Sequence, residues 1–215
     1  MLFRSLFEKI ALTLHGTTEL KVGDKTINFK APFRRISIIE AIQENTGIDI
    51  TSMDETALRE VCKKLHIEVA PTIGKGKLID EIFGATSEPK YIQPTFIIDY
   101  PIEMSPLTKK HRSKEGLVER FELMVNGKEL ANAYTELNDP IDQRKRFEEQ
   151  LALMERGDDE AMFIDHDFLR ALEYGMPPTS GIGIGIDRLC MMMLNQPSIQ
   201  DVLFFPQMRP EASND

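Results

Sequence analysis

A glycine-alternating segment near the C-terminus carries the first candidate chemistry. Residues 181–188 read Gly-Ile-Gly-Ile-Gly-Ile-Asp-Arg. Side chains alternate along a strand, so Gly181, Gly183 and Gly185 would leave one face bare while the isoleucines enter the core from the other. Glycine weakens a strand, so a bare face indicates the close approach of a flat ligand, or of another backbone or aromatic ring. Arg188 adds a permanent cation where the next helix begins.

Carboxylates gather on a predicted hairpin. Asn126-Gly127 predicts its two-residue turn, because a type I′ turn needs positive φ at both positions. In that register Glu122 faces Ala131, and Glu122 and Glu129 become diagonal neighbours on one face, where they repel unless a cation lies between them. Such a pair suits Mg²⁺, which takes one or two protein carboxylates together with waters and phosphate oxygens. The alternative is an exposed hairpin whose carboxylates face water.

Glu136 lies seven residues after Glu129. Seven is an odd number, so a regular strand would put Glu136 on the opposite face, together with Asn132 and Tyr134. If all four side chains share one ligand face, a β-bulge must lie between Glu129 and Asn132.

The elements that must position these residues alternate between strand and helix patterns. Helices are predicted over residues 5–14, 37–46, 54–65, 74–83, 139–156, 167–174 and 187–194, and strand or hairpin segments over 20–29, 95–100, 119–125, 128–138 and 180–186. The predicted fold is therefore α+β: an antiparallel sheet flanked by helices, with a small helical insert at about residues 37–90.

The composition sets limits on function. With 215 residues, 41% apolar and 28% charged, the chain is that of a globular protein. No segment approaches the ~18 apolar residues of a membrane span, so no membrane partner is expected. Cys62 and Cys190 form no C-x-x-C pattern, and we expect a reducing cytoplasm. A net charge of −9 argues against broad nucleic-acid binding by this chain alone.

Four blocks of sequence resemble the class II lysyl-tRNA synthetases, in the order of that family. "GIGIGIDRL" at 181–189 is similar to motif 3, which would span about 180–194, and "RFELMVNGKELANAYTELNDP" at 120–140 resembles the hairpin that precedes it. "TFIIDYPIEMSPLTK" at 95–109 and "GDDEAMFIDHDFLRALEYGMPPTSG" at 157–181 match as well. The resemblance begins near residue 25 and identifies the chain as the C-terminal part of a class II catalytic domain.

The resemblance implies a role for each site residue. Arg188, as the catalytic residue, would bind the γ-phosphate of ATP, and Gly183 and Gly185 would form the floor beneath the nucleotide. Glu129 and Glu136 would hold Mg²⁺ between the phosphates, with Glu122 beside them. The residues that would line the amino-acid pocket are Asn132, Tyr134 and Glu136.

The same resemblance indicates the substrate. Related aspartate-specific enzymes carry an arginine where this chain has Glu136, and a glutamate there would attract a cationic amino acid. The implied reaction joins lysine to ATP as lysyl-adenylate and then transfers lysine to tRNA(Lys), in a homodimeric parent enzyme. Catalysis would rest on positioning and on charge stabilisation.

The family's motif 1, motif 2 and anticodon-binding domain have no counterpart in the sequence. We therefore expect a truncated product that does not catalyse the reaction alone. Two alternatives stay open: a ligase that attaches lysine to a protein acceptor, and a non-catalytic interaction module derived from a synthetase.

Overall fold

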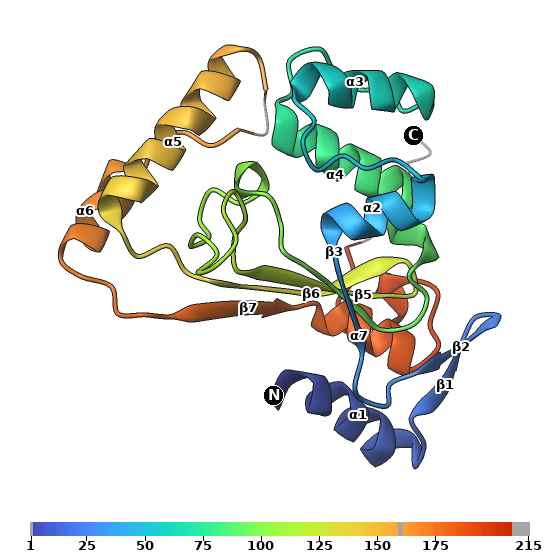
Figure 1. Ribbon diagram of the computed structural model, residues 1–215. Helices are drawn as coiled ribbons and strands as arrows, with labels where there is room; N and C mark the ends of the chain where they lie inside the picture. Colours follow the sequence, from blue (N-terminus) through green and yellow to red (C-terminus); the bar gives the residue numbers. More distant parts are fainter. Residues whose placement is uncertain (1, 159–160, 208–215) are drawn as a thin grey trace, which may run out of the picture. The chain divides into compact units, whose positions relative to one another are not determined.

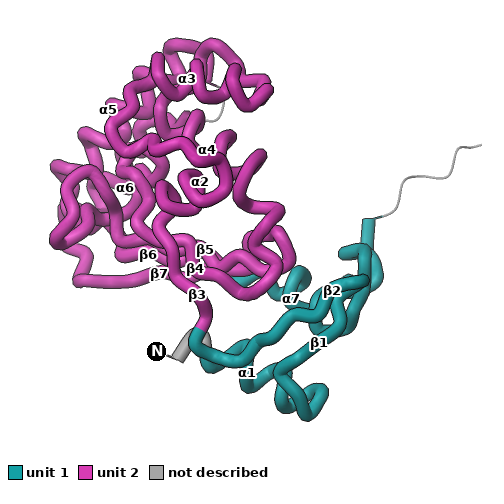
Figure 2. Tube along the Cα trace, turned by 45° about the vertical axis from the view of Figure 1, so that its right-hand side comes forward, with its two compact units in different colours: residues 1–32, 184–215 teal, residues 33–183 magenta. Residues whose placement is uncertain are grey.

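The computed structural model describes residues 2–158 and 161–207. The chain forms two compact units, one of residues 33–183 and one of residues 1–32 with 184–215 (Figure 2).

The larger unit is built on a five-stranded sheet in the order β3-β4-β5-β6-β7. Its strands are β3 (Arg34–Ser37), β4 (Thr95–Ile98), β5 (Arg120–Val125), β6 (Lys128–Thr135) and β7 (Ser180–Ile184). β3 runs parallel to β4, whereas the pairs β4–β5 and β5–β6 are antiparallel. Together with the helices around it, this sheet confirms the predicted α+β class.

Three helices separate β3 from β4: α2 (Ile38–Thr46), α3 (Glu55–Lys64) and α4 (Lys75–Thr86). Their ends follow from local sequence. Ser37 and Glu40 form a capping box at the start of α2, and Gly47 ends that helix at φ 73. The Asp54 side chain accepts a hydrogen bond from the third amide of α3.

The core of this unit lies between these helices and one face of the sheet (Figure 1). Ile36, Ile97 and Met124 supply the sheet side, and Ile42 and Leu78 are among the helix residues that pack against it. Fully burying a side chain of this size contributes about 1.5–3 kcal/mol. This face is therefore held rigidly, and it is also the face that carries Glu122.

Two further helices, α5 (Pro140–Glu155) and α6 (His166–Glu173), follow β6. Asp139 caps α5, with Pro140 at its first position, and Phe147 packs edge-on against Phe168 of α6 at 6.1 Å between ring centroids. Short 3₁₀ turns lie at Glu88–Lys90 (η1) and Ile102–Met104 (η2).

The smaller unit holds α1 (Leu2–His15), the hairpin of β1 (Glu19–Val22) and β2 (Lys25–Asn28), α7 (Ile186–Met193) and η3 (Ile199–Asp201). The Gly23 amide donates to Asn195 Oδ1 at 2.7 Å, which ties the hairpin turn to the end of α7. In the part of the chain that the structure describes, no helix is long and apolar enough to cross a membrane.

One prediction for the glycine-rich segment is wrong. β7 ends at Ile184, so Gly185 is the N-cap of α7 and not a strand residue. Ile182 and Ile186 do not enter a core but are 50% and 59% exposed. Ile182 lies on an edge strand of the sheet, and Ile186 begins α7.

Candidate active site

The β5–β6 hairpin turns at Asn126 and Gly127, as predicted. Their φ angles are 55° and 70°, the positive values that a type I′ turn requires. The Gly127 amide also donates to Tyr91 O at 3.0 Å, which anchors the turn to the segment after η1. The register of the two strands is thereby fixed from the turn outward.

A β-bulge lies where the sequence required one. Met124 pairs with Glu129, but the next pair is Leu123 with Ala131, so Leu130 has no partner. The bulge changes the alternation of β6, and Glu129 therefore shares a face with Asn132 and Tyr134. The same shift puts Asn132 opposite Glu122, and the predicted pairing of Glu122 with Ala131 is wrong.

The residues on this side of the hairpin form what we call the polar face. It carries Arg120, Glu122, Glu129, Asn132 and Tyr134, and the next even position, Glu136, follows directly after β6. All six side chains are half-buried. The hairpin therefore brings together every candidate that the sequence placed on it.

Arg120 joins the polar face into a network. Its guanidinium donates to Glu122 Oε1 at 2.5 Å and to Asn132 Oδ1 at 3.2 Å. It also donates to Ser105 Oγ at 2.9 Å, and it lies 4.6 Å above the centroid of the Tyr100 ring. This arginine therefore fixes the orientation of two candidate ligand residues at once.

Glu136 lies where β6 meets β7. Its amide donates to Thr179 O at 3.0 Å, and its backbone bridges to Thr108 on the other side. A Cβ built on Gly181 would overlap Glu136 Oε1, so the carboxylate lies over the bare face of β7. On the same strand, a Cβ at Gly183 would come no closer than 3.9 Å to the Asn132 carbonyl oxygen.

The electrostatics of the polar face favour a bound cation. Burial raises the pKa of Glu122, the Arg120 guanidinium counteracts this, and the negative charge of Glu129 raises it again. Burial also raises the pKa of Glu136. The pKa of Tyr134 is raised by burial first and by the Glu136 charge second. Two separate places on this face thus carry a negative charge that a cation would stabilise.

The bulge puts Glu129 on the same face of the hairpin as Asn132 and Tyr134, and Glu136 is the next even position after them. That Glu129 and Glu136 hold Mg²⁺ together with phosphate oxygens stays a prediction. No group of three or more metal-binding side chains occurs among residues 2–158 and 161–207.

The remaining candidates lie in the smaller unit. Gly185 caps α7 without a side-chain hydrogen bond, and Arg188 is the third residue of that helix, with an exposed side chain. The hairpin residues belong to the larger unit, as do Gly181 and Gly183. Gly185 and Arg188 belong to the smaller unit.

Comparison with known proteins gives the family. The family model described as tRNA synthetases class II (D, K and N) matches residues 1–209. The chain belongs to this family. A lysine–tRNA ligase of Porphyromonas gingivalis (strain ATCC 33277) is 69% identical over 206 residues, 96% of this chain and 36% of that protein. Those of Azobacteroides pseudotrichonymphae and Christiangramia forsetii are 68% and 66% identical, each over 96% of this chain.

The resemblance to the lysine-specific class II synthetases is thereby confirmed. The class II chain spans 36% to 41% of the length of these relatives. Its similarity to them therefore covers the site described above, within a minor share of the whole enzyme.

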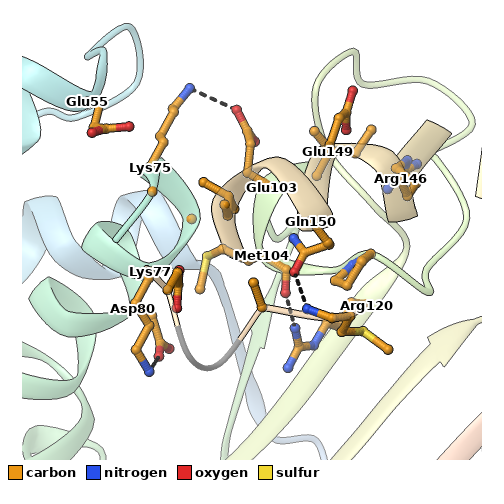
Figure 3. A pocket seen from close by; sticks show the side chains of 18 residues that line it. Glu55, Lys75, Lys77, Asp80, Glu103, Met104, Arg120, Arg146, Glu149 and Gln150 are labelled. Carbon is orange, nitrogen blue, oxygen red and sulfur yellow. Dashed lines mark hydrogen bonds and ion pairs between the residues drawn. The ribbon is translucent and has the colours of Figure 1, made fainter. Parts of the chain in front are cut away.

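A cavity of about 550 Å³ adjoins the polar face of this class II chain (Figure 3). It lies between the start of α4, η2 and α5, and Arg120 forms part of its wall, whereas Glu122, Glu129 and Glu136 do not. Charges of both signs face it: Lys75, Lys77, Arg120, Arg146, Glu55, Asp80, Glu103, Glu149 and Asp158. The mixed lining does not select a cationic or an anionic ligand.

Sequence reasoning missed Arg120 as a residue of this class II site, and it missed the close approach of Gly181 to Glu136. Arg120 lies two positions before Glu122, so strand alternation alone places it on the same face. Gly181 was assigned to the bare face of the glycine segment, but its relation to Glu136 depends on the pairing of β6 with β7, which no spacing in the sequence reveals.

Proposed function

We propose that this chain forms the lysine-binding surface and part of the ATP-binding surface of a lysine–tRNA ligase. The observation that carries the proposal is Glu136. Its half-buried carboxylate lies over Gly181, its charge raises the pKa of Tyr134, and burial raises the pKa of Glu136 itself, because the carboxylate is partly removed from water. A primary ammonium group would restore that stabilisation through a charge-assisted hydrogen bond.

Asn132 and Tyr134 would complete the amino-acid pocket. Both lie on the polar face with Glu136, and the hydrogen bond from Arg120 to Asn132 Oδ1 leaves the Asn132 amide group oriented as a donor. A substrate carboxylate would be repelled by Glu136. The pocket therefore favours a cationic amino acid over an acidic one.

Glu129 and Glu136 would hold Mg²⁺, with Glu122 beside them, and the ion would offset the charge of the ATP phosphates. The exposed backbone of Gly183 and Gly185 would lie beneath the nucleotide, and Arg188 would bind its γ-phosphate. Such a site accelerates attack of the lysine carboxylate on the α-phosphate, with loss of pyrophosphate, by positioning and charge stabilisation.

We infer that the 215 residues alone do not complete this reaction, since they span 36% to 41% of the relatives. Transfer to tRNA(Lys), a homodimeric parent and a cytoplasmic location follow from the same proposal.

Amino-acid binding to the 215-residue chain tests the proposal. Chemical-shift titration should show that lysine binds and that glutamate and aspartate do not. Glu136→Gln should weaken lysine binding about tenfold, the size of one charge-assisted hydrogen bond. Glu60→Gln is the matched control, because its side chain is 66% exposed on α3 and pairs with Lys63 on the same helix. Equal binding of lysine and glutamate would refute the proposal and favour the interaction module.

A further inference from the structure

The position of the Glu136 carboxylate depends on the absence of a side chain at Gly181 of β7. The Glu136 amide is fixed by its hydrogen bond to Thr179 O, so its side chain has a set starting point at the edge of β7. From there Oε1 occupies the space that a Cβ on Gly181 would take, and Cδ would lie 3.4 Å from that Cβ.

Backbone conformation does not explain this glycine. Gly181 is not among the glycines with positive φ, such as Gly127 at 70°. A larger residue could adopt the backbone conformation of Gly181 without strain, and glycine within a strand costs roughly 0.5–1 kcal/mol relative to alanine. The close approach of Glu136 is therefore the feature that requires glycine here.

We propose that Gly181 is a positioning residue, which lets the Glu136 carboxylate lie over β7 and thereby makes the pocket selective for a cationic amino acid. The inference rests on the proposed function, in which Glu136 binds the ammonium group of lysine. It adds a second determinant of specificity on a different strand, which acts only through Glu136.

Replacing Gly181 by alanine distinguishes an effect on the position of the Glu136 carboxylate from an effect on the stability of the fold. The atom in its way is the end of a flexible side chain and not backbone, so Glu136 can rotate aside while the sheet stays intact. Gly181→Ala should therefore keep or slightly raise thermal stability. Lysine affinity should fall about tenfold, because the carboxylate no longer reaches its hydrogen-bonding position.

Gly84 provides the matched control. It lies in α4, which carries none of the proposed site residues, and its added Cβ would approach Glu88 Oε2 only to 4.0 Å. Gly84→Ala should leave the Glu136 carboxylate where it is.

The experiment compares the 215-residue chain with Gly181→Ala, Gly84→Ala, Glu136→Gln and the double variant Gly181→Ala/Glu136→Gln. Lysine affinity is measured by titration, and the position of Glu136 by its ¹³C carboxyl signal, assigned through its loss in Glu136→Gln. We expect Gly181→Ala to shift that signal and to weaken lysine binding, and Gly84→Ala to do neither. In the Glu136→Gln background, Gly181→Ala should have no further effect on affinity.

Two results would overturn the inference. One is a Glu136 signal that Gly181→Ala leaves unchanged. The other is a loss of lysine affinity that persists undiminished in the Glu136→Gln background. If the unsubstituted chain binds no lysine, the proposed function fails by itself, and the carboxyl signal still decides whether Gly181 positions Glu136.

Discussion

Replacing Arg120 by methionine would leave Glu122 as an unpaired carboxylate in a poorly solvated place. The Arg120 and Glu122 side chains are 17% and 14% exposed, and their ion pair measures 2.5 Å. Removing one partner of a buried pair costs about 3–5 kcal/mol, because the remaining charge loses its compensation. Since neither side chain is fully buried, we expect the free energy of unfolding to fall by about 3 kcal/mol.

Urea unfolding of Arg120→Met at pH 7 measures this cost. The matched control is Arg34→Met, whose pair with Glu44 has side chains 51% and 46% exposed, and which should lose less than about 1 kcal/mol. The double variant Arg120→Met/Glu122→Leu should recover most of the loss, because it removes the uncompensated charge together with its partner.

The cost should also depend on pH in a defined direction. Burial raises the folded-state pKa of Glu122, so its charge destabilises the fold increasingly as pH rises through that pKa. Without Arg120 the effect grows, and the difference between variant and unsubstituted chain should shrink as pH falls and Glu122 is protonated in both. A loss below about 1 kcal/mol at pH 7, or a double variant as unstable as the single one, would refute this account of Arg120.

Three other outcomes are expected. Hydrogen bonding from Arg112 lowers the pKa of Glu119 from 4.5 to about 2, so the stability it contributes is complete above pH 4.5 and is lost toward pH 2. Glu119→Gln should then lose about 1 kcal/mol at pH 7 and nothing at pH 2, by thermal unfolding, since Arg112 is largely exposed. Mn²⁺ binding, followed by electron paramagnetic resonance, should weaken about tenfold in Glu129→Gln and in Glu136→Gln and stay unchanged in Glu60→Gln; binding that Glu136→Gln leaves unchanged would remove Glu136 from the metal site. The 215-residue chain should show no lysine-dependent exchange of pyrophosphate into ATP, and exchange that Arg188→Ala abolishes would contradict this.

Local chemistry explains why the elements were predictable from the sequence. Helix ends at Ser37, Gly47 and Asp139 follow from caps that act within four residues of themselves. The Asn126-Gly127 turn fixes its own hairpin in the same way. The burial of β7 could not be predicted from such local signals. The exposure of Ile182 depends on the position of β7 at the edge of the sheet, which is set by the pairing of distant strands.

The site shows the same division between local and non-local information. The parity of the spacing from Glu129 to Asn132 predicted a bulge, and the structure places one at Leu130 because the ligand face and the alternation of a strand cannot otherwise agree. Parity determines a face but not what another strand brings against it. The place of the Glu136 carboxylate over Gly181 depends on the pairing of β6 with β7, a contact that no spacing within the hairpin contains. The ammonium site proposed for Glu136 is therefore complete only once β7 has paired with β6.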